Sequence, residues 1–479
     1  MHNFVEYLRY RAHADRDRTA ILLDGGALTF GRLAVIVAGA ALQFRRLGVR
    51  PGQIVITETP DKTTDWILTL ALMHEGAVTC SVTSSQRESL PFAWDWRVTT
   101  FAQSQPATNT LLIDPDWLER AAKGGDALEP VGFAPESPFR ITLTSGTTGK
   151  AKASCQSLQG TRQRIESQLI HFGALPAWNP LSMNMMIGFN SAVNALMTGQ
   201  PLLCVTDLAR VTKLLERGAI EAIYASPAQL ARLASELAAA GVRPGALKVA
   251  SFTGVEPTAT QLALVRQHLC SEIVGFYGAT EVGRVCMRRI TPDADTSNVG
   301  YPLPDCAIEI VDATDRPVAP NQTGSIRIRS PFMIRGYHGD AAATAAAFRD
   351  GWFYPGDRGF LRDDGMLVLA GRDREVVNRD GVKIDPSEID RFLSDRPGIE
   401  DAAAFGYRNA AGILTLGVAI VSRMPIDRQR LRQDLLARFG SVGVPSSVIR
   451  VNRIPRNAMG KAERQRLAQA LEAGVAREA

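Results

Sequence analysis

A loop rich in glycine and hydroxyl groups is the stretch of this chain best suited to chemistry. It consists of Thr144, Ser145, Gly146, Thr147, Thr148, Gly149, Lys150, Ala151 and Lys152. Its glycines leave the backbone open, so that amide groups can converge on an anion. The hydroxyls and lysines add donors and positive charge. Residues 139–143 predict a short strand before the loop, and α/β proteins bind phosphates where a strand ends. We therefore expect a phosphate site.

The loop is not a Walker A motif. That motif has four residues between its first glycine and its Gly-Lys pair, whereas Gly146 and Gly149 have two residues between them. A hydrophobic strand ending in the aspartate of a Walker B motif is also missing. A P-loop NTPase or a nucleotide-binding regulatory module is nevertheless a possible interpretation. Nucleotide binding that survived removal of residues 374–479, with no loss of turnover, would favour it.

Four further stretches carry polar side chains that could join the loop in one site. They are residues 276–281, 352–357, 371–375 and 453–461. The first supplies an aromatic ring, a hydroxyl and a carboxylate directly after an apolar strand. The second ends in Asp357, just past a tight turn, which suits hydrogen bonds to vicinal ribose hydroxyls. The last places Lys461 after a glycine. Each stretch alone also fits an ordinary turn or a solvated surface.

Taken in this order, the five stretches resemble the AMP-forming adenylating superfamily, which comprises acyl- and aryl-CoA synthetases, peptide-synthetase adenylation domains and luciferases. The resemblance covers nearly the whole chain. It implies an α/β fold with two domains. Residues 1–372 would form a large N-terminal domain that binds ATP and the acid, made of α/β subdomains and a small β-rich subdomain. Residues 373–479 would form a mobile α+β lid carrying the catalytic lysine.

The resemblance also implies how ATP is held. The loop from Thr144 to Lys152 would wrap the β- and γ-phosphates and later release pyrophosphate. Tyr277 would stack on adenine, and Asp357 and Arg372 would bind the ribose hydroxyls. The segment that would cover the other face of adenine consists of Gly254, Val255, Glu256 and Pro257.

Catalysis falls, by the same resemblance, to Lys461, Thr280 and Glu281. Thr280 would contact the α-phosphate and Glu281 would help to hold Mg²⁺. Lys461 would bridge the oxygens of the acid and of the α-phosphate, and Asp373 matches the hinge of the lid. A carboxylate that attacks phosphorus brings two anions together, so a cation between them stabilises the transition state most.

The residues expected around the acid are Met185, Met186, Phe189 and Gly278. Where amino-acid-activating members of the superfamily carry an aspartate, this chain has Met186. An ammonium group buried there would lack its counter-charge. Residues 381–390 also resemble the form found in acyl- and aryl-CoA ligases. Together these features favour a simple carboxylic acid, hydrophobic or aromatic, although a Met/Phe cluster is also typical of plain core.

The expected activity is that of an AMP-forming acid–thiol ligase that uses ATP and Mg²⁺. Eighteen residues follow Lys461, so we expect a stand-alone enzyme whose acceptor comes from outside. Coenzyme A is the first choice. The alternative is an adenylase that loads an amino or acyl acid onto the phosphopantetheine of a free-standing carrier protein.

Hydrophobic periodicity predicts the elements that must position these residues. Helices are expected at 4–14, 29–47, 65–74, 158–172, 190–197, 386–395, 427–438 and 462–473. Strands are expected at 20–23, 54–57, 202–205, 222–225, 249–252, 307–311, 325–329 and 366–370. The alternation of strand and helix predicts a largely parallel sheet. Residues 79–135, rich in Ser, Thr, Gln and Pro, are expected to be irregular and peripheral.

Composition excludes several classes of function. The net charge of +5 is too small to indicate a nucleic-acid or membrane partner, and no apolar run is long enough for a membrane span. The six cysteines form no C-x-x-C pair, which favours free thiols in a reducing cytosol. We expect a cytoplasmic protein. From Arg423 onward basic residues outnumber acidic ones, which fits either a solvated helical face or a surface that meets an anionic substrate.

Overall fold

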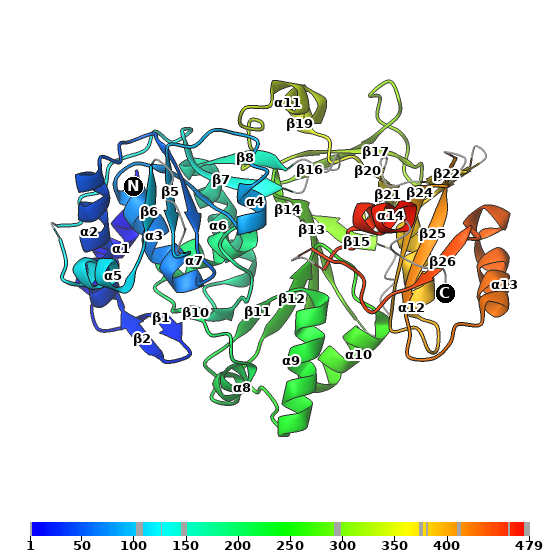
Figure 1. The fold of residues 1–479 in the computed structure, drawn as a ribbon, viewed down its shortest axis with the longest axis horizontal. Coiled ribbons are helices and arrows are strands. Elements are labelled where there is room, and N and C mark those ends of the chain that lie inside the picture. The colour runs from blue at the N-terminus through cyan, green and yellow to red at the C-terminus, as the bar shows by residue number, and fades with distance from the viewer. Residues whose placement is uncertain are drawn as a thin grey trace.

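The computed structural model describes residues 2–101, 109–125, 127–144, 151–291, 298–372, 377–379, 382–409, 413–457 and 460–473. Figure 1 shows a large N-terminal part made of two sheets with helices around them, and a smaller C-terminal part beside it. Antiparallel strands lie between these two parts.

The first sheet follows the order β6-β5-β3-β4-β7-β8. Its parallel strands are β3 (Ile54–Glu58), β4 (Val78–Ser81), β5 (Trp96–Thr99), β6 (Thr110–Leu112) and β7 (Pro138–Thr144), and β8 (Lys152–Ser157) runs antiparallel to β7. Alternate residues point to opposite faces, so Val55 joins the main core while Ile56 faces the other side. The helices of the main core on this sheet are α1 (Val5–Ala14), α2 (Phe30–Leu47), α3 (Lys62–His74) and α5 (Pro115–Ala122).

The second sheet continues from parallel into antiparallel strands. Its strands are β1 (Thr19–Leu23), β2 (Gly26–Thr29), β9 (Ala177–Trp178), β10 (Leu202–Cys204), β11 (Ala222–Tyr224), β12 (Val249–Thr253), β13 (Ile273–Ala279), β14 (Gly283–Arg289) and β15 (Asn298–Pro302). Helices α8 (Leu208–Glu216), α9 (Pro227–Ala240) and α10 (Ala259–His268) cover one face. Helices α6 (Leu158–Phe172) and α7 (Met186–Thr198) pack into the main core of the first sheet. Gln168 of α6 also contacts Tyr224 of the second sheet, so α6 bridges the two sheets.

A β-rich unit extends the second sheet through the pairing of β15 with β21. Its elements are β16 (Ala307–Val311), β17 (Gly324–Arg329), α11 (Ala341–Ala347), β18 (Phe348–Arg349), β19 (Trp352–Phe353), β20 (Asp357–Leu361) and β21 (Leu367–Arg372). It has a core of its own that includes Ile308, Ile326 and Leu367.

The C-terminal part is built on a sheet of β24 (Asp401–Arg408), β25 (Leu414–Val421) and β26 (Ser447–Arg450). Helices α12 (Pro386–Ser394) and α13 (Arg428–Phe439) pack on one face and α14 (Arg464–Glu472) packs on the other. The remaining short elements are α4 (Ser84–Arg87), β22 (Val377–Arg379), β23 (Val382–Ile384) and the 3₁₀ turn η1 (Ser441–Gly443).

The mixed α/β fold is confirmed, and most elements lie where periodicity predicts them. Thr29 caps α2, because its side chain accepts from the backbone of Arg32. Helix α3 begins at Lys62 rather than near 65, because Asp61 caps it. The domain boundary at 372/373 stays a prediction, since Asp373 lies outside the described residues. No helix in the described ranges is long and apolar enough to cross a membrane.

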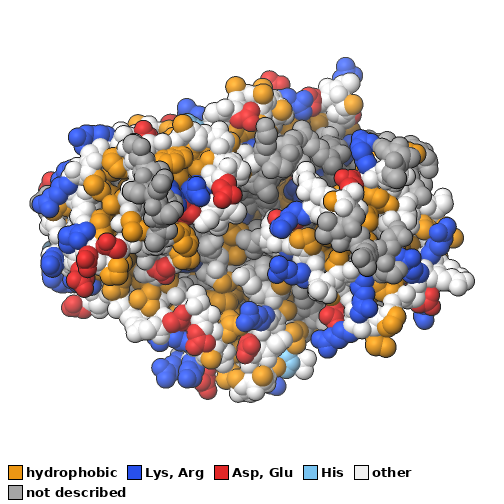
Figure 2. Space-filling view, viewed as in Figure 1, with side chains coloured by type: hydrophobic (Ala, Val, Ile, Leu, Met, Phe, Trp, Pro, Cys, Tyr) orange, Lys and Arg blue, Asp and Glu red, His pale blue; other side chains and the backbone are white. Residues whose placement is uncertain are grey.

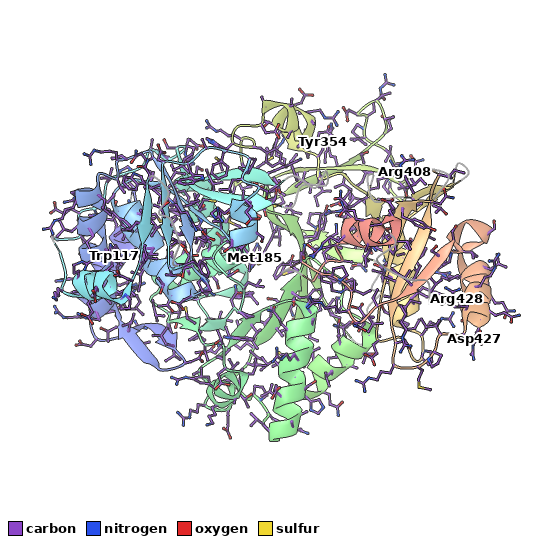
Figure 3. All side chains as sticks on the ribbon, viewed as in Figure 1. Trp117, Met185, Tyr354, Arg408, Asp427 and Arg428 are labelled. Atoms are coloured by element: carbon purple, nitrogen blue, oxygen red, sulfur yellow. The ribbon has the colours of Figure 1, made fainter. Side chains whose placement is uncertain are left out.

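The expectation that residues 79–135 are peripheral is wrong. This stretch completes β4, supplies β5 and β6 to the first sheet, and forms α5. Trp117 of α5, labelled in Figure 3, is buried with its ring centre 5.5 Å from that of Phe44. Strands of three or four residues are too short to show a period, which is why the polar residues around them dominated the prediction.

Candidate active site

The glycine-rich loop begins and ends at one point of the first sheet. Thr144 and Lys152 are paired across β7 and β8, and Thr144 Oγ1 lies 3.5 Å from Lys152 O, to which it donates. The loop leaves the carboxyl end of a parallel strand, where α/β proteins bind ligands. The rest of the predicted loop lies outside the described residues, namely Ser145, Gly146, Thr147, Thr148, Gly149 and Lys150. Their role at phosphates stays a prediction.

Tyr277, Asp357 and Arg372 meet where the second sheet joins the β-rich unit. Asp357 begins β20 opposite Arg372, the last residue of β21, and their Oδ1 and Nε atoms lie 2.6 Å apart. Tyr277 Oη donates to Asp357 Oδ2 at 2.6 Å. Asp357 is only 5% exposed. Burial, together with the charge of Asp357, raises the pKa of Tyr277 well above its ordinary value, so the hydroxyl remains a donor. Three residues from separate motifs thus form one cluster.

Glu281 is held by a residue that sequence reasoning missed. Tyr337 Oη donates to Glu281 Oε1 at 2.8 Å, and Glu281 is 6% exposed. Lys152 Nζ lies 4.6 Å from the centre of the Tyr337 ring, within range of a cation–π contact. Tyr337 also pairs with Ser154 of β8. Tyr337 therefore links the end of the phosphate loop to the predicted magnesium carboxylate. No polar motif around it in the sequence could have indicated this role.

Gly278 stands where two backbones come too close for any side chain. A Cβ atom at Gly278 would lie 2.0 Å from the carbonyl oxygen of Gly283. The approach of β13 to β14 thus requires glycine, and it leaves the Gly278 backbone exposed. Thr280 directly follows β13 and is half-buried. The structure places it beside Glu281, as the sequence order demands.

The predicted adenine-covering segment meets the C-terminal part. Glu256 forms an ion pair with Arg288 of β14. Burial raises the pKa of Glu256, whereas Arg288 and, more weakly, Arg391 of α12 act to lower it. A Cβ atom built on Gly460 would lie 3.8 Å from Val255 Cγ2. The C-terminal part therefore lies against residues 254–257. Neither Arg288 nor Arg391 was identified from the sequence.

The loop that carries Lys461 is held tightly to its own sheet. Lys461 N donates to Asn457 Oδ1 at 3.0 Å, and Asn457 N donates to Lys461 O at 2.9 Å. Arg456 donates to the Gly460 carbonyl and pairs with Asp401 of β24. Gly460 has a φ of +83°, which favours glycine. Because Gly460 also lies beside Val255, the structure brings the Lys461 loop to the segment predicted to cover adenine.

The residues expected to line the acid pocket separate into two groups. Met185 caps the start of α7, and in Figure 3 it lies at the side of the N-terminal part that faces the strands of the second sheet. Met186 is 8% exposed. Phe189, by contrast, is 0% exposed, with its ring 4.6 Å from the guanidinium carbon of Arg140. Phe189 thus packs in the core, and its place in the pocket wall stays a prediction.

The chemistry of Glu281 fits Mg²⁺ bound together with a nucleotide. Within the described ranges, no group of three His, Cys, Asp or Glu side chains could hold a metal alone. Magnesium that binds together with a nucleotide takes one or two carboxylates from the protein and completes its coordination shell with phosphate oxygens and water. A single buried carboxylate, oriented by Tyr337, meets that requirement. Figure 2 shows Lys and Arg side chains near the middle of the visible face, between the N-terminal and C-terminal parts.

Comparison with known proteins identifies the family. Residues 8–338 match the model of the family described as AMP-binding enzyme. The chain belongs to this family. Two relatives of the AMP-binding enzyme are a CoA ligase and a carrier-protein ligase. This chain is 27% identical over 390 residues to the indoleacetate–CoA ligase of Aromatoleum aromaticum, and the match covers 74% of this chain and 72% of that protein. This chain is also 28% identical over 389 residues to a medium/long-chain fatty-acid–[acyl-carrier-protein] ligase of Mycobacterium tuberculosis, and the match covers 75% of this chain and 71% of that protein.

Solved structures show the same fold. The O-succinylbenzoate coenzyme A synthetase of Bacillus subtilis, in complex with ATP and magnesium, matches the AMP-binding enzyme with a TM-score of 0.83. The two share 20% sequence identity, and the match covers 96% of this chain and 98% of that one. At that identity the likeness concerns the fold alone.

Proposed function

We propose that this AMP-binding enzyme is an AMP-forming acid–thiol ligase, similar to acyl-CoA synthetases. It would convert an apolar or aromatic carboxylic acid and ATP into an acyl-adenylate and pyrophosphate, and then pass the acyl group to coenzyme A. One observation carries the proposal. Gly460 lies beside Val255, and Thr253 of the preceding strand pairs with Phe276, next to Tyr277, which bonds to Asp357; these distant residues thus share one region that would suit a nucleotide beside a lysine.

In the first step an oxygen of the acid attacks the α-phosphorus, and the bond from that phosphorus to the bridging oxygen of pyrophosphate breaks. Lys461 would lie between the two anions, where its charge acts most in the transition state. Tyr277, Asp357 and Arg372 would fix the nucleoside. Magnesium, when bound, neutralises charge on the phosphates, and Glu281 would hold it. Positioning and electrostatics therefore supply most of the catalysis.

In the second step the thiol sulfur attacks the acyl carbon, the carbon–oxygen bond to AMP breaks, and the thiol proton passes to solvent. Coenzyme A is our first choice as acceptor, supported by the indoleacetate–CoA ligase relative. The carrier-protein ligase relative supports the alternative, in which a free-standing carrier protein provides the thiol. Either acceptor fits the cytoplasmic location predicted from the sequence.

The test is exchange of radiolabelled pyrophosphate into ATP with a panel of carboxylic acids. Lys461→Ala should lower the exchange rate roughly 100- to 1,000-fold while the KM for ATP stays nearly unchanged. Lys248→Ala is the matched control, because Lys248 is an exposed lysine paired with Glu221. Formation of ADP and phosphate would refute the proposal. Exchange supported by amino acids alone would favour the adenylase alternative. Repeating the assay with coenzyme A or a carrier protein identifies the acceptor by the thioester formed.

A further inference from the structure

Arg284 lies beside the part of the site where the acid must sit. It stands on β14 directly opposite Gly278 of β13. Gly278 in turn lies two residues before Thr280, the expected contact of the α-phosphate. Residues opposite each other on paired strands have their Cβ positions roughly 5 Å apart. Because Gly278 is a glycine, no side chain at that position separates Arg284 from the space over the strand.

Two aromatic rings hold the guanidinium group of Arg284. Its central carbon lies 4.5 Å from the ring centre of Phe276 and 5.3 Å from that of Tyr224. Tyr224 is fixed in turn, because its hydroxyl accepts from Gln168 Nε2 of α6 at 3.3 Å. These contacts are cation–π interactions with rings on the face of the second sheet that α6 approaches. The guanidinium therefore points away from Thr280, toward Phe276.

Arg284 has no anionic partner within the described part of the chain. Its Nη1 atom is buried there without a hydrogen-bond partner. The nearby carboxylates are taken by other groups, since Glu256 pairs with Arg288 and Glu281 accepts from Tyr337. Burial lowers the pKa of Arg284, and only Tyr224 opposes this effect. The Arg284 side chain is partly exposed, but a buried guanidinium nitrogen without a hydrogen-bond partner is costly, and binding of an anion removes that cost.

We propose that Arg284 selects acids that carry a second acidic group at the end remote from the activated carboxylate. The substrate class is a dicarboxylic acid, or a carboxylic acid with another terminal anion, whose spacer is apolar. The proposal rests on the proposed ligase function. Met185 and Met186, which the sequence predicts to line the acid pocket, are apolar as the spacer requires, whereas Arg284 provides a planar fork of N–H donors that matches a carboxylate.

The experiment compares matched acids in pyrophosphate exchange. Each monocarboxylate is paired with its terminally carboxylated counterpart, benzoate with terephthalate and octanoate with suberate, and with the half methyl ester of that diacid. We expect the wild-type kcat/KM to be roughly 10- to 100-fold higher for the diacid, as for loss of a hydrogen-bonded charged contact. Arg284→Met should abolish this preference chiefly through the KM for the acid, and Arg284→Lys should restore part of it.

Arg289→Met provides the control, because Arg289 lies on the same strand but is exposed and paired with Glu272. It should leave the preference unchanged, and melting temperatures will show that both variants fold. Equal use of diacids and monoacids by the wild type, or a preference that persists in Arg284→Met, would overturn the inference while leaving the ligase function intact. Exchange absent with every acid would refute the ligase function, and the inference with it.

Discussion

The hydrogen bond from Tyr277 to Asp357 provides a direct test of the nucleotide site. Its 2.6 Å length is that of a hydroxyl donating to a charged carboxylate. Tyr277→Phe keeps the ring for stacking but removes the donor. A hydrogen bond to a charged group contributes about 1.5–3 kcal/mol, which corresponds to roughly a 10- to 100-fold change in an equilibrium constant. The carboxylate is 5% exposed, so water can replace the lost donor only in part.

We therefore expect Tyr277→Phe to raise the KM for ATP about tenfold, with a smaller effect on kcat, and to lower the melting temperature. The first effect follows because Asp357 would lose the orientation needed to bind the ribose. Pyrophosphate exchange at varied ATP measures the KM, and thermal unfolding measures stability.

Tyr354→Phe makes the same chemical change three residues before Asp357, on a hydroxyl whose partners are Asp315 and Arg327. The Tyr354 hydroxyl donates to Asp315 at 3.2 Å and accepts from Arg327 at 3.3 Å. Figure 3 shows Tyr354 at the edge of the β-rich unit. We expect it to change stability by no more than about 0.5 kcal/mol and to leave the KM for ATP unaltered. If Tyr277→Phe behaved like Tyr354→Phe, the assignment of Asp357 to the ribose would be refuted.

Two further substitutions test the packing at Gly278 and the cost of a buried charge at Lys62 of α3. Gly278→Ala places a methyl group 2.0 Å from the carbonyl oxygen of Gly283. We therefore expect a loss of about 1–3 kcal/mol or more in the free energy of unfolding and a strongly reduced rate of pyrophosphate exchange. Gly245→Ala, where a methyl group meets only open space, should match the wild type. Burial lowers the pKa of Lys62 from 10.5, its value in the unfolded chain, to about 8 in the folded protein. Between pH 8 and pH 10.5 the unfolded chain therefore binds more protons than the folded protein, and the stability of the fold rises with pH. The melting temperature of Lys62→Met should accordingly exceed that of the wild type most below pH 8, where the wild type buries a charged lysine. A difference in melting temperature that did not shrink toward pH 10 would contradict this account.

Most of the fold could be predicted because its long strands and helices have clear periods. Helix α2 and its cap at Thr29 follow directly from apolar spacing and a hydroxyl. Strands β5 and β6, with four and three residues, were missed because nothing in so short a run distinguishes a strand from a loop. Their place in the sheet depends on parallel neighbours distant in sequence.

The site was predictable only where one residue type in one motif carries the chemistry. Asp357 and Tyr277 stand in motifs, and their meeting follows from the fold. Tyr337 contacts Glu281 only because β8 pairs with the segment around it, a register that no local pattern shows. Arg284 looks like any strand arginine until its missing counter-charge is seen.

The full burial of Phe189 could not be predicted for a similar reason. Phe189 follows Met186 by three residues in α7, so both lie on one side of the helix. Sequence spacing cannot distinguish a side chain that ends at a pocket from one that continues into the core. The contact with Arg140, itself fully buried, decides the matter, and it joins residues on separate elements.

The contact between the C-terminal part and residues 254–257 combines two forces that respond differently to the solution. Gly460 lies beside the apolar side chain of Val255, whereas Arg391 acts on Glu256 through charge. Salt screens charges that are open to solvent, but it leaves apolar contacts largely intact. We therefore expect ionic strength to weaken the charge contact between α12 and Glu256 and to leave the surroundings of Gly460 unchanged. The fraction of molecules in which the C-terminal part lies against residues 254–257 should thus depend on the surrounding electrolyte as well as on the chain.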